Sequence, residues 1–451
     1  MPPYRIALLG CGTVGREVLH LLTDPDTGHS GPRSEARPIE VRAIVVRDPS
    51  LPRDLPEEIE APLTDDPLAV CRADDIDLIV EVAGGVDAPA EWIRTSLEHG
   101  KDVVTANKAV LAERGGELFA LARKHGRQLL FEASVAGALP LLHALEGGLP
   151  AGKIEDITGI LNGTCNHVLE ELGRGASFEN AVIHAQAAGL AEADPTLDLA
   201  GTDAAHKIAL VAQLMTGAAV DLDRIRCEGI EAVQPIDLAY GRSHGWTLKL
   251  LAVFRPRNGG AAIGVYPAWI DAHSPLASVR DEYNGVSITS PVYGSLLFVG
   301  KGAGGRATAG SVVADIFRAA RSERESAAAR STSGTDEAAA RELAPLEILD
   351  PFEEPARYHL RFLVADRPGV LAQIAGALGS LGISIAAAEQ PSASPPHVPI
   401  HITTHPVVAE RLDRALAAII ASGVVAAPPL RIRVEAGGTK PAQVDDESAT
   451  K

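Results

Sequence analysis

Asp203 and Lys207, two residues of opposite charge, stand four positions apart in the stretch GTDAAHKIALVAQL. This spacing places both side chains on one face of an α-helix. A carboxylate beside a lysine favours the ammonium form, which holds a proton ready for donation at neutral pH. The apolar residues that follow, Ile208, Leu210 and Val211, predict a helix lodged inside a domain. A generic surface ion pair is the alternative interpretation.

More carboxylates precede this helix, at Glu192, Asp194 and Asp198 in GLAEADPTLDLAG. The Ala-Asp-Pro sequence discourages helix and indicates a turn-rich approach. Such a loop can aim a carboxylate at the amine of a ligand. An Asp in this position can also simply cap the helix.

The glycine-rich motif GCGTVG (10–15) follows a predicted strand at 4–9 and opens a predicted helix at 14–22. This is the context that a dinucleotide-binding fingerprint requires. The first glycine permits the tight turn, the second lets the backbone approach a pyrophosphate, and the third allows close helix packing. We therefore expect a cofactor at Gly10, Gly12, Thr13, Val14 and Gly15.

Two further strand ends bear on the cofactor. The second strand ends in VVRD, where Arg47 can pair with the 2′-phosphate of NADP and Asp48 would suit NAD. We favour NADP, with NAD as the alternative. The motif TANK places Thr105 and Lys108 at the carboxyl edge of the sheet, where ligands bind in open α/β folds. Lys108 is expected to contact cofactor or substrate, and a solvated loop lysine is the alternative.

Cys165, in LNGTCNHVL, raises a different chemistry, the attack of a thiolate on an aldehyde. His167 is two residues away, but no clear activating environment accompanies the pair. We therefore favour a small buried core cysteine. The histidines show no metal-ligand spacing, so a transition-metal site is not expected.

Length and charge exclude several classes of protein. A chain of 451 residues predicts two or three domains, and its formal net charge of −18 argues against nucleic-acid binding. The four cysteines show no CxxC spacing, which indicates a reducing, cytoplasmic compartment. Neither a signal peptide nor an apolar run long enough to cross a bilayer is evident, so no membrane partner is expected.

Short β-rich runs alternate with helical stretches such as 109–125 over residues 1–150. This alternation predicts a Rossmann-type, doubly wound parallel sheet in an α/β fold. Residues 24–38 are rich in turn formers and are interpreted as a surface insertion. The expected strands are 4–9, 39–46, 76–85, 102–108 and 128–134.

The remaining chain divides into further units. Residues 151–304 predict an α+β substrate and dimerisation domain. A helix at 308–320, capped by Thr308 or Ser311, is expected to pack back on the first domain. Residues from about 305 to 321 are therefore assigned to the dinucleotide-binding domain together with residues 1–150. Residues 321–352 read as a partly helical linker, 353–436 as a ferredoxin-like βαββαβ unit, and 437–451 as a disordered tail.

The stretch AQAAGLAEADPTLDLAGTDAAHK (185–207) resembles the homoserine dehydrogenase signature along its whole length. GCGTVG, TANK, FEASVAGALP, TGILNGTCN and VGKGAGGRATAGSVVADI also resemble that family, in its usual order. The resemblance covers about residues 4–320. DRPGVLAQIA and LGISI in the C-terminal unit are similar to ACT domains, which commonly bind amino acids.

This resemblance implies NAD(P)-linked interconversion of L-homoserine and L-aspartate 4-semialdehyde, in the biosynthesis of threonine, methionine and isoleucine. Lys207 would be the acid–base residue and Asp203 its partner. Glu192 would hold the substrate amino group. The other implied substrate-binding residues are Asp198, Asp203, Lys108 and Thr164.

The resemblance also implies further ligands and partners. Gly189 and Gly302 would approach the nicotinamide half of the cofactor. A structural monovalent cation, Na⁺ or K⁺, would be held largely by backbone carbonyls of Glu132, Val135, Gly137 and Leu139. The family leads us to expect a homodimer or homotetramer. L-Threonine is the expected feedback inhibitor, bound near the DRPG loop (366–369), with a purely structural ACT unit as the alternative.

Arg306 and Ala307 depart from the family pattern, which more often has a proline before the Thr-Ala pair. Two rival functions also stay open. One is a phosphorylating aldehyde dehydrogenase that uses Cys165. The other is a non-catalytic amino-acid sensor that keeps a cofactor fold, although such a sensor would have no need of the proton donor Lys207.

Overall fold

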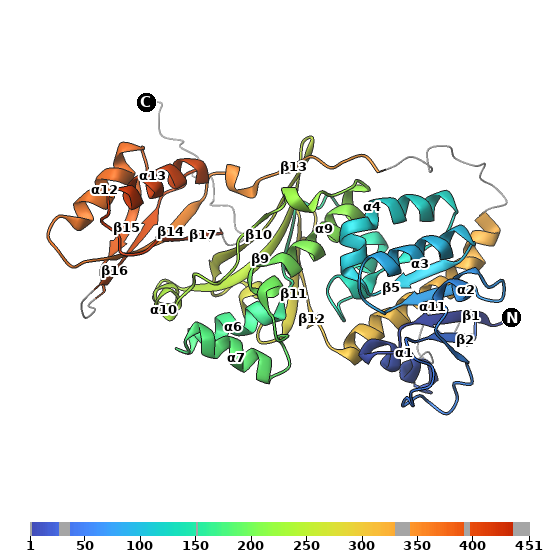
Figure 1. Cartoon of the computed structure of the whole chain (residues 1–451). Coiled ribbons are helices and arrows are strands. Elements are labelled where there is room, and N and C mark those ends of the chain that lie inside the picture. Colours follow the sequence, from blue (N-terminus) through green and yellow to red (C-terminus); the bar gives the residue numbers. More distant parts are fainter. Residues whose placement is uncertain (1, 27–36, 150–151, 330–342, 392–396, 436–451) are drawn as a thin grey trace.

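The computed structural model describes residues 2–26, 37–149, 152–329, 343–391 and 397–435. Three units follow one another along the chain: a parallel sheet with helices, a central antiparallel sheet, and a smaller C-terminal unit (Figure 1). The predicted tail and much of the predicted surface insertion and linker lie outside the described residues. Among the described helices, none has the length and apolar character that a membrane crossing requires.

The first unit is a six-stranded parallel sheet in the order β3-β2-β1-β4-β5-β6, which confirms the predicted Rossmann-type fold. The strand order reverses between β1 and β4, and ligands bind at such a switch point. The strands are β1 (Tyr4–Leu9), β2 (Ile39–Val45), β3 (Leu63–Thr64), β4 (Leu78–Glu81), β5 (Asp102–Thr105) and β6 (Leu129–Leu130). The helices are α1 (Thr13–Thr23), α2 (Pro67–Arg72), α3 (Asp87–Glu98) and α4 (Lys108–Lys124).

The expected strand at 128–134 is shorter than predicted. Only β6 pairs with β5, and Glu132–Ser134 forms a turn of 3-10 helix, η2. The buried carboxylate of Glu132 accepts the amides of Leu142 and His143, each at 2.8 Å, which bends the chain away from the sheet.

Helix α11 (Gly305–Ala329) returns to the first unit and packs against α1 and β5, as predicted. The predicted cap was wrong, because the helix begins at Gly305 and both Thr308 and Ser311 lie inside it. The Ser311 hydroxyl instead donates to the carbonyl of Gly137 at 2.6 Å. The helix continues into the predicted linker as far as Ala329, so the linker is partly helical as expected.

The central unit is built on antiparallel strands in the order β12-β11-β7-β9-β10. They are β7 (Asp156–Ile160), β9 (Trp246–Arg257), β10 (Gly260–Asp271), β11 (Tyr283–Ser290) and β12 (Gly294–Lys301), while β8 (Arg226–Cys227) and β13 (Ile348–Leu349) also pair with β10. The helices are α5 (Leu141–His143), α6 (Gly163–Gly173), α7 (Phe178–Ala187), α8 (Thr196–Leu199), α9 (Thr202–Thr216) and α10 (Pro235–Ser243).

The C-terminal unit has the predicted βαββαβ order and the ferredoxin-like strand arrangement β17-β14-β16-β15. Its strand β17 also pairs in parallel with β10, so that Trp269 lies opposite Val434 and one continuous sheet joins the two units. The elements are β14 (Arg357–Val364), α12 (Val370–Ser380), β15 (Ile385–Glu389), β16 (Val398–Thr404), α13 (Ala409–Ala421) and β17 (Leu430–Val434).

Candidate active site

Helix α9 carries the predicted acid–base pair and points it into the protein. The Lys207 ammonium lies 2.7 Å from Oδ2 of Asp203 and donates to the carbonyl of Leu161 at 2.6 Å. The Asp203 side chain is 6% exposed and that of Lys207 12% exposed, which excludes the alternative of a generic surface ion pair. The opposite face of α9 is buried in the core, as predicted, at Ile208, Leu210 and Val211.

A second lysine reaches the same carboxylate from the other domain. Lys108 begins α4, directly after the N-cap residue Asn107, and its ammonium pairs with Oδ1 of Asp203. Burial alone would raise the pKa of Asp203, but Lys207 and Lys108 hold this pKa well below its usual value. The two domains therefore meet at an ionised aspartate that binds two cations.

Asn162 connects two of the predicted carboxylates, and sequence reasoning missed it. Its amide nitrogen donates to Asp198 at 2.7 Å and to Asp203 at 2.9 Å. Its oxygen accepts the amide of Cys165 at 2.8 Å and so caps α6. Burial and the neighbouring Asp203 raise the pKa of Asp198, although Asn162 opposes this shift. The only sequence signal was an N-cap residue in LNGTC.

The other residues of the predicted substrate site lie around this cluster. The Thr164 hydroxyl donates to the Leu190 carbonyl at 2.7 Å and lies 3.4 Å from the Asp198 carboxylate. Asp198 is in the short helix α8 and not in a loop. Glu192 is exposed on the segment between α7 and α8, and Gly189 lies near the start of that segment, directly after Ala188, the C-cap of α7.

Cys165 is fully buried, and its thiol donates to the carbonyl of Asp198 at 3.0 Å. Burial, together with the nearby carboxylates of Asp198 and Asp203, raises the thiol pKa well above its usual value. A reactive cysteine needs the opposite environment. The structure therefore favours the core role that the sequence indicated.

The glycine-rich motif closes the turn between β1 and α1, as predicted. Gly10 has φ +102°, and a Cβ atom there would lie 2.8 Å from Cα of Ala83. A Cβ atom at Gly15 would contact the carbonyl oxygen of Gly10. Gly12 is the N-cap of α1, and the free amides of Thr13 and Val14 belong to its first turn.

A pocket of about 590 Å³ opens beside this turn at the ends of β1, β2 and β4. Gly10, Gly12 and the predicted Arg47 line it. Arg53, which was not predicted from the sequence, lines it as well. Asp48 also lines the pocket, but its carboxylate accepts the hydroxyl of Ser50 at 2.6 Å and its amide at 2.9 Å. Asp65 is a second carboxylate that lines the pocket. Two guanidinium groups and two carboxylates, one of them already bonded to Ser50, thus lie beside the dinucleotide turn.

A buried glutamate, Glu81, connects the ends of two neighbouring strands beside the dinucleotide turn. Glu81, at the end of β4, accepts the hydroxyl of Thr105 at 2.7 Å and the amide of Ala83 at 2.9 Å. Burial raises its pKa, although both hydrogen bonds oppose the shift. This contact fixes the end of β4 to the end of β5, from which Lys108 departs.

The predicted cation loop lies between the domains. Val135, Gly137 and Leu139 are buried, and Gly137 has φ +62°. A Cβ atom at Gly137 would contact the carbonyl oxygen of Gly302, so the two loops touch. Outside the regular elements, no other described residue donates a hydrogen bond to the carbonyls of Val135 and Leu139.

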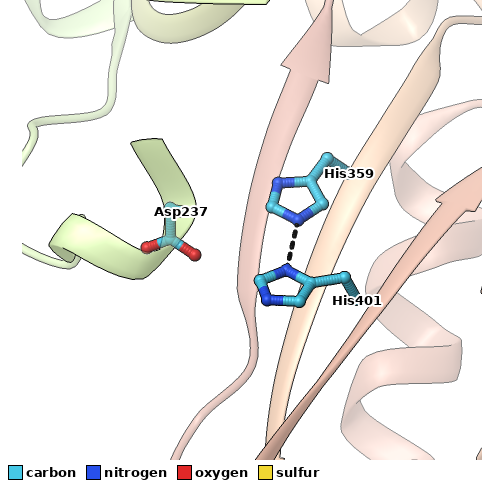
Figure 2. Close-up of side chains that lie close together, drawn as sticks. All are labelled: Asp237, His359 and His401. Atoms are coloured by element: carbon cyan, nitrogen blue, oxygen red, sulfur yellow. Dashed lines mark hydrogen bonds between the residues drawn. The ribbon is translucent and has the colours of Figure 1, made fainter. Parts of the chain in front are cut away.

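Asp237, His359 and His401 form a different buried polar cluster, where α10 meets β14 and β16 (Figure 2). Trp269 donates to Nδ1 of His359 at 3.1 Å, so Nε2 of His359 carries the proton and donates to Nδ1 of His401 at 2.9 Å. Both acceptor nitrogens are thereby occupied. Arg361 also binds the Asp237 carboxylate, at 2.7 Å. The three side chains thus join the units and do not present a free ligand set for a metal.

The comparisons with known proteins agree with this geometry. Residues 10–132 match the family described as "Homoserine dehydrogenase, NAD binding domain", residues 140–317 the family "Homoserine dehydrogenase", and residues 358–423 the family "ACT domain". The chain is 36% identical to homoserine dehydrogenase from Pseudomonas aeruginosa, over 96% of this chain and 99% of that protein. It is 37% identical to that of Corynebacterium glutamicum, over 95% of each chain.

Solved structures give the same result. The crystal structure of a homoserine dehydrogenase from Thiobacillus denitrificans matches with a TM-score of 0.85 and 34% identity, covering 96% of this chain and 99% of the other. The Staphylococcus aureus homoserine dehydrogenase at pH 7.5 matches with a TM-score of 0.71 and 29% identity, with the same coverage. With its NAD-binding domain, its buried lysine–aspartate site and its ACT domain, the chain belongs to the homoserine dehydrogenase family of oxidoreductases.

Proposed function

We propose that this chain interconverts L-aspartate 4-semialdehyde and L-homoserine with NADP, with Lys207 as the acid–base residue. The observation that carries the assignment is the buried pair of Lys207 and Asp203, 2.7 Å apart, at the junction of the two domains. Asp203 also pairs with Lys108 of the dinucleotide domain, which supports a proton donor close to the cofactor. The reaction class itself follows from membership of the family.

The nicotinamide, when bound, supplies or accepts the hydride. During reduction the aldehyde oxygen becomes an alkoxide, which Lys207 stabilises by its charge and protonates from Nζ. Such a positioned acid contributes about 10²–10⁴-fold in rate. Asp203 keeps Lys207 oriented through their 2.7 Å contact. In the oxidative direction Lys207 must first lose its proton, so that direction is expected to gain from alkaline pH.

The surrounding residues would bind the substrate. Lys108 pairs with the same Asp203 from the dinucleotide domain, which supports a role for Lys108 between cofactor and substrate. Asp198 and Thr164 form one wall of the cluster. Glu192, exposed on the neighbouring segment, would bind the substrate ammonium, which requires that segment to close over the site.

NADP is favoured over NAD by the charges in the pocket at the ends of β1, β2 and β4. A 2′-phosphate is a dianion that arginine binds well. Arg47 and Arg53 both line this pocket, and Arg47 forms no hydrogen bond or ion pair with another described residue. Asp48, the residue that would suit a ribose hydroxyl, already accepts two bonds from Ser50.

A structural monovalent cation fits the loop at 132–139, because the buried carbonyls of Val135 and Leu139 lack donors outside the regular elements of the described residues and so suit a hard cation. Glu132, Val135, Gly137 and Leu139 would hold it, and the cation would fix the loop against Gly302. Replacing Na⁺ and K⁺ by tetramethylammonium at constant ionic strength is expected to lower the melting temperature. An unchanged melting temperature would argue against the cation.

The ACT domain implies an amino-acid effector, which we propose to be L-threonine. We also propose that the protein is a homodimer or homotetramer. The amides at the start of α12 suit a carboxylate, and Gly369, with φ +89°, forms the N-cap. L-Threonine is expected to lower turnover and raise the melting temperature. If neither quantity changes, the ACT unit is structural.

The proposed activity is tested by following NADPH oxidation with L-aspartate 4-semialdehyde and NADP reduction with L-homoserine. Both are expected to proceed without phosphate or arsenate and to survive Cys165→Ala. A requirement for phosphate together with loss of activity in this variant would instead support the phosphorylating aldehyde dehydrogenase. Absence of turnover in both directions, with NADPH still bound, would support the sensor.

A further inference from the structure

A second pocket, of about 240 Å³, lies between the C-terminal half of α6, helix α10 and strand β9. It is smaller than the roughly 300–1,000 Å³ of sites for drug-sized ligands, which fits a small metabolite. The catalytic lysine and the dinucleotide turn do not line it. Its lining residues are Leu169, Glu170, Gly173, Arg174, Leu238, Arg242, Trp246, Thr247, Leu248, Lys249 and Arg280.

Two buried charges of opposite sign line this pocket. The Lys249 side chain is 1% exposed and donates to Oδ1 of Asn166 at 2.7 Å and to the carbonyl of Val279 at 2.6 Å. Its ammonium is 3.6 Å from Oε1 of Glu170, whose side chain is 9% exposed. The buried oxygen Oε2 of Glu170 accepts no hydrogen bond from any described residue, and its ion pair with the Arg174 guanidinium is long, at 3.7 Å. A buried acceptor left without a donor costs about 1–3 kcal/mol, so a ligand that donates there would bind favourably.

Three arginines surround the same pocket and supply positive charge. Arg174 pairs with Glu171 at 2.5 Å and, more distantly, with Glu170 at 3.7 Å, while Arg242 donates to the carbonyl of Gly173. Arg280 is exposed, and its guanidinium makes no hydrogen bond or ion pair with another described residue. Its guanidinium is thus available to bind a carboxylate in two-pronged geometry.

We propose that this pocket binds a free α-amino acid, with the ligand ammonium on Oε2 of Glu170 and its carboxylate on Arg280. The C-terminal end of α6 adds partial negative charge beside Glu170, which favours the ammonium there. Leu169, Leu238 and Trp246 supply an apolar wall for the ligand side chain. An anion without an ammonium would leave the buried Glu170 oxygen without a donor.

The two helices around the pocket connect it to both functional parts of the chain. Helix α6, about 16 Å long, begins next to Asn162, which binds Asp203. Helix α10 carries Leu238 on the pocket and Asp237 in the buried bond to Arg361 of the ACT domain. A ligand that shifts either helix would change turnover as well as bind.

The full-length protein is to be titrated with each of the twenty common L-amino acids, and with succinate as an anion that lacks an ammonium. Binding is followed by the fluorescence of Trp246, which lines the pocket, and by calorimetry. At least one amino acid is expected to bind saturably and to do so at least tenfold more weakly to Glu170→Gln and to Arg280→Gln. The matched control, Arg72→Gln on α2, changes an exposed arginine outside the pocket and should bind like the wild type.

Three results would overturn the proposal. The first is that no amino acid binds saturably. The second is that binding is unchanged in both pocket variants, which would assign it to the ACT domain or the active site. The third is that succinate binds as tightly as the amino acid and that the Glu170→Gln substitution leaves the binding of both unchanged. Because both pocket variants leave Lys207 and Asp203 intact, basal turnover reports on the active site independently.

Discussion

The ammonium of Lys207 and the carboxylate of Asp203 lie 2.7 Å apart on one face of α9, and the other oxygen of Asp203 pairs with Lys108 from the dinucleotide domain. One carboxylate therefore positions a lysine from each of two domains. Because Asp203 and Lys207 are both nearly buried, water screens their pair weakly, whereas Lys108 is 44% exposed and its pair with Asp203 is screened more. The relative placement of the domains and the charge of the proton donor depend on the same residue.

Replacing Lys207 should separate binding from proton transfer. Lys207→Ala is expected to bind NADPH like the wild type and to lose about 10²–10⁴-fold in turnover, because the alkoxide then lacks its acid. Lys207→Arg keeps the charge but holds its proton too tightly to give it up, so it should also turn over slowly. NADPH titration by fluorescence and steady-state rates measure the two effects. Near-normal turnover of either variant would contradict the assignment.

Asn162 is expected to act by positioning the carboxylates. Asn162→Ser can still cap α6 but cannot donate to both Asp198 and Asp203. We expect a melting temperature close to that of the wild type and about a tenfold lower kcat/KM for the substrate. Asn162→Ala loses the cap as well and should cost about a further 1 kcal/mol in the free energy of unfolding. Equal kcat/KM in wild type and Asn162→Ser would remove the positioning role.

Much of this site could be predicted from sequence because the information is local. The spacing of Asp203 and Lys207 places both side chains on one face of a helix. The glycines of GCGTVG indicate a tight turn and a close approach of the backbone to a ligand. Lys108 and Asp203 are far apart in the chain, so their direct contact depends on how the domains dock, which no local pattern encodes. The helix start at Gly305 was missed because Ser311 looks like a cap, whereas tertiary packing gives its hydroxyl a different partner.

The junction with the ACT domain was the least predictable feature. Pairing of β17 with β10 places Trp269 opposite Val434, 165 residues further along the chain, and nothing in either strand specifies the partner. Likewise, His359 and His401 carry no recognisable spacing, yet the antiparallel pairing of β14 with β16 brings them together.

Cofactor preference is expected to depend on the two arginines of the dinucleotide pocket. Arg47→Ala should raise the KM for NADPH about 10–100-fold, the effect of one lost hydrogen bond to a charged group, and leave the KM for NADH nearly unchanged. Arg53→Ala should act in the same direction, less strongly, because Arg53 also donates to the carbonyls of Leu51 and Asp48. Parallel steady-state assays with both cofactors decide the point. Equal losses with NADH and NADPH would show that these arginines do not bind a 2′-phosphate.

The histidine pair at the ACT junction should make the stability of this interface sensitive to acid. Burial lowers the pKa of His401 to about 4 and that of His359 well below its usual value. The folded state thus favours the neutral rings, whereas the unfolded chain takes up protons below about pH 6.5. Their stabilisation is therefore complete above about pH 6.5 and is lost as the pH falls toward 4.

Other groups facing the pair modify this dependence. Arg361 and His244 add positive charge that also disfavours protonation of His401. Asp237 acts in the opposite sense, because burial raises its pKa to about 6 and its protonation in the folded state becomes favourable as the pH falls below that value. The histidine contribution is therefore isolated by a variant and not by the pH profile of the wild type alone.

His401→Gln removes one of the two buried rings and should flatten the fall of the melting temperature between pH 6.5 and 4 by a few degrees relative to the wild type. Calorimetric scans across this range measure the difference. His184→Gln is the matched control, because His184 is 56% exposed and pairs only at the surface with Glu171, so its slope should equal that of the wild type. A neutral buried ring at the junction must take up a proton when the interface opens at acid pH. If the melting temperature of His401→Gln falls with pH as steeply as that of the wild type, acid therefore acts elsewhere in the protein.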